Sequence, residues 1–167
     1  HLGHPLNLEI EPGRFRVAQS GGVVSQVRAV KQMGSRHFVL VDAGFSDLMR
    51  PAMYGSYHEI SLMPADGSPP DTTRLCESVV AGPLCESGDV FTQLEGGMVE
   101  PRWLPAAKVG DYLVFHDTGA YGASMSSNYN SRPLIPEVLF SGGKVREIRR
   151  AQTIGELLAL ESDVAGE

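Results

Sequence analysis

The sequence predicts a mainly β domain with a few short helices, and three observations lead to this fold class. Short apolar runs rich in β-branched residues recur along the chain, which is typical of strands. Nineteen glycines and 11 prolines are spread through the 167 residues, as expected for many short elements joined by turns. Only the last segment combines helical spacing with a capping signal. A chain of this length fits one domain with a sizeable core.

The first half of the chain is expected to contain mostly strands. Residues 6–10 alternate apolar and polar side chains, which indicates a strand that ends at Glu11-Pro12-Gly13. Residues 15–24 are expected to form a short helix despite Gly21-Gly22. Further strands are expected at 23–30, 38–41 and 57–63, followed by an exposed Pro-, Gly- and Ser-rich loop at 64–73.

The second half continues this pattern and ends in a helix. Strands are expected at 78–81 and 112–115, and residues 137–149 are typical of a hairpin around Gly142-Gly143. Thr153 and Glu156 match a capping box, in which the Thr side chain accepts from the third helical amide while Glu reaches back. Leu157, Leu158 and Leu160 supply the apolar positions of this helix, and residues 162–167 are expected to be frayed.

Composition excludes several classes of protein. A formal net charge of −6 and the absence of a long Lys/Arg cluster argue against nucleic-acid binding. Cys76 and Cys85 do not make a disulfide framework, so we expect a reducing, cytoplasmic compartment. No apolar run is long enough to span a bilayer, and no secretory signal is visible.

Metal and common nucleotide or hydrolase chemistries are also not indicated. The five histidines and two cysteines have no close metal-ligand spacing beyond His1/His4, so no metal site is expected. The sequence contains neither a Gly-x-Ser-x-Gly elbow nor a Gly-x-x-x-x-Gly-Lys-Ser/Thr phosphate loop.

A first candidate motif is Glu11-Pro12-Gly13-Arg14. A strand that ends in Pro-Gly exposes backbone amides, and Gly13 allows close approach of a ligand. A phosphate could bind such amides, with Arg14 adding charge, and Glu11 could accept a hydrogen bond from a protonated ring nitrogen. The alternative is a plain turn flanked by a surface ion pair.

A second candidate is the pair Arg50 and Tyr54, which are four residues apart. On a helical turn this spacing puts both side chains on one face. A guanidinium beside a phenol suits a substrate carboxylate. The alternative is a surface arginine packed on an aromatic ring.

The remaining candidates are Cys85-Glu86-Ser87-Gly88-Asp89 and Tyr121. A cysteine beside acidic groups can donate a proton if its thiol stays protonated, which neighbouring negative charge favours. The alternative is a buried free cysteine. Tyr121 is expected on a flexible glycine-bounded loop, where its hydroxyl could reach a phosphate or substrate; the alternative is a half-buried loop aromatic.

Singly these motifs are weak, but their order and spacing are specific. Together they resemble the C-terminal portion of the diaminopimelate decarboxylases, in the pyridoxal-phosphate-dependent ornithine/diaminopimelate/arginine decarboxylase family of the alanine-racemase-like type. The resemblance covers nearly the whole chain. It rests on Glu11–Arg14, Val41-Asp42-Ala43-Gly44, Arg50–Tyr54, Gly82–Asp89 and the long run Thr118–Pro133. The Cys-Glu-Ser-Gly-Asp form separates the decarboxylases from the racemases.

This resemblance implies a fold and a reaction. The family has fold type III, a (β/α)8 barrel followed by a β-rich barrel or sandwich domain. Residues 1–24 would be the last strand, the Glu-Pro-Gly-Arg loop and the last helix of the barrel, and residues 25–167 the β domain. Active-site residues at the C-terminal end of a barrel strand agree with the rule for such barrels. The implied reaction is loss of CO2 from meso-diaminopimelate to give L-lysine.

The resemblance also implies a role for each motif residue. Pyridoxal 5'-phosphate would be held by Glu11 at its ring nitrogen and by Pro12, Gly13, Arg14 and Tyr121 around its phosphate. The distal end of the substrate would be bound by Arg14, Arg50 and Tyr54, with Tyr121 also in contact. Cys85 and Glu86 would reach the site of the partner subunit in a homodimer. There Cys85 would donate a proton to the reacting carbon and Glu86 would bind the distal ammonium.

The chain departs from the family in one respect that matters. The Schiff-base lysine of the family lies in an early barrel strand, and Lys31, Lys108 and Lys144 match no position for it. We therefore expect a fragment of a longer enzyme that is inactive alone and does not retain the cofactor. Two alternatives remain open. One is a stand-alone interaction or oligomerisation module with the same β fold, and the other is an unrelated β-barrel binding domain.

Overall fold

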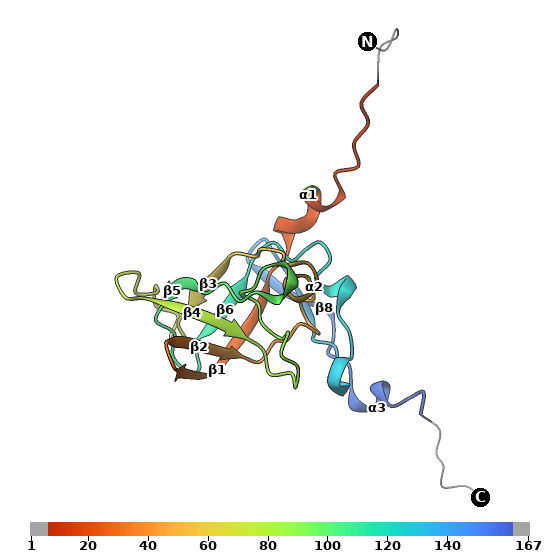
Figure 1. Ribbon diagram of the computed structural model, residues 1–167. Helices are drawn as coiled ribbons and strands as arrows, with labels where there is room; N and C mark the ends of the chain where they lie inside the picture. The colour runs from red at the N-terminus through yellow and green to blue at the C-terminus, as the bar shows by residue number, and fades with distance from the viewer. Residues whose placement is uncertain (1–6, 162–167) are drawn as a thin grey trace, which may run out of the picture.

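The computed structural model describes residues 7–161 and confirms a mainly β fold with short helices (Figure 1). Six strands form one sheet in the order β3-β6-β1-β2-β4-β5. They are β1 (Val23–Met33), β2 (Arg36–Val41), β3 (Ile60–Met63), β4 (Leu75–Ala81), β5 (Arg102–Pro105) and β6 (Tyr112–Phe115). The pairing of β2 with β4 is parallel and the other pairings are antiparallel. The edge strands β3 and β5 come into contact, so the sheet curls into a nearly closed barrel.

The core fills this barrel with the inward-facing side chains of alternate strand positions. Val27 of β1, Val39 of β2 and Leu113 of β6 are almost completely buried, and β1 bends at a bulge between Val27 and Ala29. Phe91 and Phe115 pack with ring centroids 4.4 Å apart. Side chains of a strand point alternately to the core and away from it. For this reason the β-branched runs at 23–30, 38–41 and 112–115 predict their strands correctly.

A separate hairpin and a set of short helices complete the chain. The hairpin is β7 (Glu137–Ser141) with β8 (Lys144–Arg149), as predicted. The α-helices are α1 (Gly13–Val17), α2 (Arg50–Tyr54) and α3 (Ile154–Leu157), and the 3-10 turns are η1 (Ala18–Ser20), η2 (Glu95–Gly97), η3 (Ala123–Met125) and η4 (Tyr129–Ser131). The capping box at the start of α3 is confirmed, with both reciprocal hydrogen bonds of Thr153 and Glu156 present.

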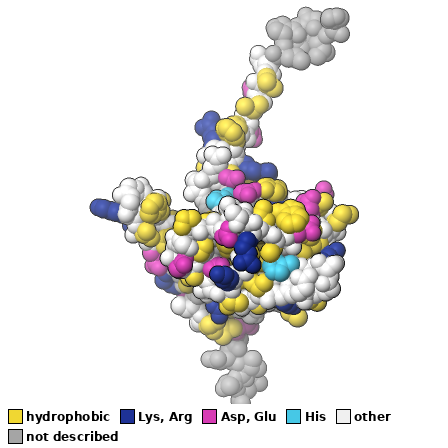
Figure 2. Space-filling view, turned by 90° about the vertical axis from the view of Figure 1, so that its left-hand side faces the viewer, with side chains coloured by type: hydrophobic (Ala, Val, Ile, Leu, Met, Phe, Trp, Pro, Cys, Tyr) yellow, Lys and Arg dark blue, Asp and Glu magenta, His cyan; other side chains and the backbone are white. Residues whose placement is uncertain are grey.

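The expectations for the N-terminal segment are partly wrong. Residues 7–10 form no strand, because no other part of the described chain pairs with them, and Leu6 lies outside the described residues. In place of the expected helix at 15–24, the structure has α1 and η1, which together span residues 13–20. The helical segment ends before residue 23 because Val23 and Val24 pair with β6. Figure 2 shows this segment projecting from the body of the domain with apolar and cationic side chains exposed along it.

Three smaller differences concern strand length. β3 starts at Ile60 rather than at residue 57, since its partner β6 offers only four residues. β4 starts at Leu75 rather than at residue 78, because it pairs with β5. The sequence did not predict β5, because Pro101 precedes the strand and Pro105 is its last residue. An edge strand tolerates proline because one side of its backbone needs no ladder. The 64–73 loop is exposed as expected.

Candidate functional site

Two chain segments about a hundred residues apart are joined at the base of the site. The Gly119 N–H donates to the carbonyl of Ala18 at 2.9 Å, and the Thr118 N–H donates to the carbonyl of Gly21 at 3.0 Å. The backbones approach so closely that a Cβ on Gly119 would lie 2.1 Å from the Val17 carbonyl oxygen. The helix that carries Arg14 is therefore fixed against the loop that carries Tyr121.

We predict that Gly119→Ala breaks this junction. The added methyl group cannot fit without moving backbone, so we expect the free energy of unfolding to fall by roughly 1–3 kcal/mol. Urea denaturation of the chain measures the change. Gly155→Ala in α3 is the matched control, since the nearest atom to its Cβ is 3.9 Å away. Equal denaturation midpoints for the two variants would contradict the predicted clash.

Arg50 is positioned by a short, well-terminated helix. Pro51 fixes the first turn of α2, and Gly55 ends the helix in a left-handed conformation with φ of 59°. A side chain on Gly55 would meet the backbone of Glu95 at 2.0 Å, so only glycine allows α2 to pack on η2. The spacing of Arg50 and Tyr54 predicts one helix face, and the structure confirms it: the guanidinium lies 5.1 Å from the Tyr54 ring centroid.

The arginines and tyrosines form one cluster. Besides Tyr54, Arg50 lies 5.2 Å from the ring centroid of Tyr121, and Arg14 lies 5.7 Å from the same ring. Tyr121 is held in the left-handed region with φ of 61°, an unusual conformation for a bulky residue. Strained residues of this kind collect at functional sites. The loop after β6 places Tyr121 between two cations.

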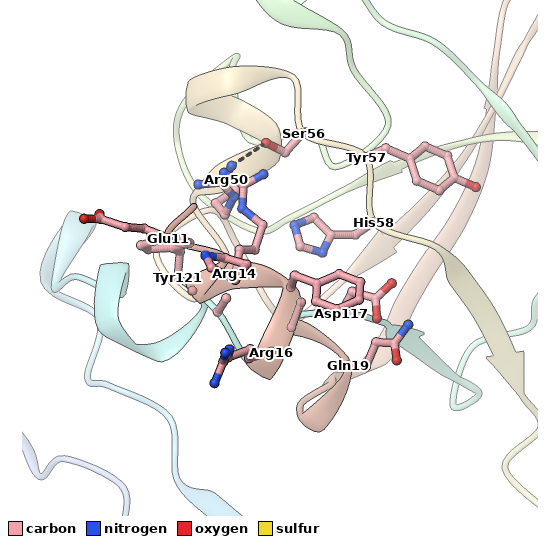
Figure 3. A pocket seen from close by; sticks show the side chains of 15 residues that line it. Glu11, Arg14, Arg16, Gln19, Arg50, Ser56, Tyr57, His58, Asp117 and Tyr121 are labelled. Carbon is pink, nitrogen blue, oxygen red and sulfur yellow. Dashed lines mark hydrogen bonds between the residues drawn. The ribbon is translucent and has the colours of Figure 1, made fainter. Parts of the chain in front are cut away.

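This cluster borders an open pocket of about 1140 Å³ (Figure 3). Its walls come from the N-terminal segment, α2, the segment between α2 and β3, and the loop after β6. They include Glu11, Pro12, Gly13, Arg14, Arg50, His58, Asp117 and Tyr121. A smaller adjoining pocket is lined by Arg14, Arg50, Tyr54, Ser56, Tyr121 and Met125. Seven predicted site residues from three separate motifs are thus brought to one place: Glu11, Pro12, Gly13, Arg14, Arg50, Tyr54 and Tyr121.

Arg50 carries an unneutralised charge within the described residues. Its side chain donates to Ser56 Oγ at 3.1 Å, and it makes no ion pair with any carboxylate of residues 7–161. The residue is only 9% exposed. A buried cation that stacks on rings and meets no anion is suited to bind an anionic group from outside the chain.

The Gly13 amide is used differently from the sequence expectation. The Glu11-Pro12-Gly13 stretch is not the tip of a strand, and the Gly13 N–H donates to the Glu11 carbonyl at 2.8 Å. Glu11 and Arg14 are exposed, and no atom lies within 4 Å of the position of a Cβ on Gly13. The space that a ligand would need beside Gly13 is therefore open.

Cys85 and Glu86 lie on a second loop and line neither pocket. The Cys85 N–H donates to Asn130 Oδ1 at 3.2 Å, and the Tyr129 hydroxyl donates to Glu86 Oε2 at 3.3 Å. Hydrogen bonds from the Gly88 amide, the Ser87 hydroxyl and Tyr129 lower the pKa of the exposed Glu86 carboxyl. The structure therefore keeps Glu86 ionised beside an exposed thiol.

A buried carboxylate supports the base of this second loop. Asp89 accepts hydrogen bonds from the amides of Phe45, at 2.7 Å, and Leu84, at 2.8 Å. Burial raises the pKa of Asp89, while these two amides act in the opposite direction. The Asp89 side chain thus ties the Cys85 loop to the segment after β2.

Some site residues were not singled out from the sequence. His58 and Asp117 border the large pocket, whereas Tyr129 and Asn130 contact the Cys85 loop. For Asn130 a signal exists, since asparagine tolerates its φ of 55°. His58 gives no local signal, because it precedes an ordinary strand and acquires its surroundings only on folding.

Two further features concern metal binding and membrane spanning. Within 7–161 no group of three or more His, Cys, Asp or Glu side chains is placed to hold a metal ion. In the same part of the chain, no helix has the length and apolar character needed to cross a membrane. Both described cysteines are unpaired, with Cys76 partly buried and Cys85 exposed.

A family model matches most of the sheet. The model describes the pyridoxal-dependent decarboxylase, C-terminal sheet domain, and matches residues 17–119. The match begins in α1 and ends in the loop before Tyr121, so it includes α2 and the Cys85 loop.

Curated relatives and solved structures extend the similarity. A diaminopimelate decarboxylase of Escherichia coli (strain K12) is 76% identical over 161 residues, which are 96% of this chain and 38% of that protein. The Streptomyces coelicolor diaminopimelate decarboxylase is 66% identical over 160 residues, or 96% of this chain and 36% of that protein.

Among solved structures, a crystal structure of diaminopimelate decarboxylase superposes with a TM-score of 0.88 at 76% identity, covering 96% of this chain and 38% of that one. The M. jannaschii diaminopimelate decarboxylase in complex with L-lysine superposes with a TM-score of 0.78 at 36% identity, covering 90% of this chain and 32% of that one. The chain thus spans 32–38% of the length of these relatives.

Proposed function

The chain belongs to the pyridoxal-dependent decarboxylases, as their C-terminal sheet domain, and from this premise we propose that it is the C-terminal part of a diaminopimelate decarboxylase. The family membership predicted from the ordered motifs is confirmed, and an unrelated β-barrel binding domain is excluded. The proposed reaction is decarboxylation of meso-diaminopimelate to L-lysine and CO2. The 76% identity to an enzyme of that name over nearly the whole chain supports it.

The observation that carries the proposal is the arginine-tyrosine pocket. Arg50 is buried without a carboxylate partner among residues 7–161 and stacks between Tyr54 and Tyr121. Diaminopimelate has a carboxylate at each end. One carboxylate is lost as CO2 in the reaction, and the other is free to bind in this pocket. We assign Arg14, Arg50 and Tyr54 to this distal carboxylate, because a planar guanidinium binds a carboxylate through two parallel hydrogen bonds.

The residues present fit part of a pyridoxal-phosphate site. Arg14 and Tyr121 bring a cation and a hydroxyl to the same wall, and the open space beside Gly13 lets a phosphate approach backbone. Glu11 lines the same pocket, where its carboxylate could keep a pyridine nitrogen protonated. When bound, the cofactor supplies an electron sink for the electrons released on loss of CO2.

The lysines of this chain are not placed for the reaction. The chain has three, Lys31, Lys108 and Lys144, and none of them lines either pocket. A lysine that holds the cofactor covalently must therefore come from elsewhere in the proposed longer protein. For this reason the 167-residue chain alone is expected to be inactive and not to retain pyridoxal phosphate.

Cys85 and Glu86 are proposed to act across a homodimer. They are exposed on a loop that lines neither pocket of their own chain. A partner subunit would place Cys85 as proton donor at the carbon that has lost CO2 and Glu86 at the distal ammonium. We further propose a cytoplasmic enzyme, since both cysteines are free thiols in this fold.

A chimera tests the proposed function. In the E. coli enzyme, the matched 161-residue segment is replaced by this chain, and release of lysine from meso-diaminopimelate is measured with added cofactor. We expect turnover within about tenfold of the parent enzyme, and none from this chain alone. The E. coli protein without its C-terminal segment is the control for residual activity.

Two outcomes would contradict this assignment. A folded chimera that binds cofactor yet makes no lysine would support the alternative of a stand-alone interaction module. Turnover by the isolated chain, persisting after full-length contaminants are removed, would refute the expected inactivity.

A further inference from the structure

His58 borders the large pocket beside the arginine cluster. It lies two residues before β3 and is only 6% exposed. Figure 3 shows its ring directed from the backbone towards the side of the pocket where Arg14 and Arg50 lie. None of the motifs considered above includes this residue, and the proposed roles of Arg14, Arg50, Tyr54 and Tyr121 make no use of it.

The hydrogen bonding of the ring fixes its tautomer. Nδ1 lies 2.8 Å from the backbone carbonyl oxygen of His116, which can only accept, so Nδ1 carries a proton. In the neutral ring Nε2 is then an acceptor. Nε2 is buried and meets no hydrogen-bond partner among residues 7–161. A buried acceptor without a donor costs free energy, which a bound donor would recover.

The surroundings keep the ring neutral. Burial is the main cause that lowers the pKa of His58 below 6.5, and the charges of Arg50 and Arg102 act in the same direction. The hydrogen bond to His116 and the charge of Asp117 oppose this change only in part. The pocket therefore presents cationic donors in Arg14 and Arg50 next to a neutral acceptor.

An α-amino acid group has the complementary chemistry, because it carries a carboxylate and an N–H donor on one carbon. We infer that Nε2 of His58 accepts a hydrogen bond from the distal ammonium of the substrate while the arginines hold the carboxylate of the same carbon. This inference rests on the proposed function and deepens it. It makes His58 a residue that distinguishes diaminopimelate from an analogue without the distal amino group, 2-aminopimelate.

Two substitutions separate this role from a structural one. In His58→Asn the amide can still donate to the His116 carbonyl, but no acceptor remains at the Nε2 position. In His58→Gln the amide oxygen lies near the Nε2 position instead. His37→Asn is the matched control, since His37 contacts Ser78 between β2 and β4 and lines neither pocket.

The experiment measures KM and kcat of the chimera for both substrates. We expect His58→Asn to raise KM for diaminopimelate roughly tenfold or more and to leave KM for 2-aminopimelate unchanged, with partial recovery in His58→Gln. His37→Asn should alter neither. An equal rise for both substrates, or no rise for diaminopimelate, would overturn the inference. An unsubstituted chimera without activity would instead reject the proposed function.

A measurement without substitution covers the case in which the variants do not fold. In the unsubstituted chimera, the imidazole ¹⁵N signal of His58 Nε2 should shift when L-lysine saturates the site. The control ligand is 6-aminohexanoate, which has the same carboxylate and chain but lacks the α-ammonium. This ligand should leave the ¹⁵N signal of His58 Nε2 unshifted. Identical shifts with both ligands, or none with L-lysine, would overturn the inference.

Discussion

Replacing Cys85 by alanine in the chimera is expected to lower kcat by about 10²- to 10⁴-fold, the range by which a positioned proton donor accelerates a reaction. The affinity for pyridoxal phosphate should stay within about twofold, because the thiol is assigned to a step after the cofactor is bound. Lysine release and a cofactor titration of the same preparation measure the two quantities.

The loop is built so that this substitution removes the thiol alone. Asn130 holds the backbone N–H of Cys85, and buried Asp89 holds the amide of Leu84. Neither contact involves the sulfur atom, so alanine should leave the loop and the stability of the domain unchanged. A fall in turnover would then result from the loss of the proton donor and not from a change in the structure of the loop.

Cys76→Ala is the matched control for Cys85. Cys76 is the other free cysteine, partly buried in β4 and paired with Leu104 of β5. Its loss should leave kcat unchanged at a modest cost in stability. Unchanged turnover in Cys85→Ala, or an equal loss in both variants, would remove the assigned role of Cys85.

Arg50→Ala is expected to lower kcat/KM for diaminopimelate roughly 100-fold, chiefly by raising KM. The estimate takes the lower end of the range of about 1.5–3 kcal/mol for each of two hydrogen bonds to a charged group. A clamp on the distal carboxylate binds the ground state and the transition state alike, so kcat should change much less. Steady-state kinetics of the chimera separates the two parameters.

Two further variants test the geometry behind this expectation. Arg50→Lys keeps the charge but loses the planar pair of donors, so we expect KM to remain at least about tenfold raised. Arg28→Ala removes an exposed arginine of β1 that lines neither pocket, and KM should not change. An unchanged KM in Arg50→Ala would mean that the buried guanidinium is structural.

Local patterns predicted those elements that depend on neighbouring residues. The alternating β-branched runs gave β1, β2 and β6, and the capping box of Thr153 and Glu156 gave α3. The spacing of Arg50 and Tyr54 also predicted their shared helix face. In each case the relevant contacts lie within a few residues or follow from one buried sheet face.

The pattern failed where pairing decides the structure. Residues 7–10 alternate as a strand should, yet they form none, because a strand needs a partner that the described chain does not offer. β5 was missed for the opposite reason: its prolines disguise it, but β4 pairs with it. Whether a segment forms a strand thus depends on a second segment that can pair with it.

By itself, the sequence of this protein determined the mainly β class, the ordered motifs and the family to which they belong. Only the tertiary structure decided that Arg14, Arg50 and Tyr121 share one pocket with His58, and that Cys85 lies on a different loop with Asn130. The physical reason is that close backbone contact at Gly119 and Gly55, together with burial of Arg50 and His58, joins segments far apart in sequence. The chemistry of a side chain is set by such neighbours, and no local pattern encodes them.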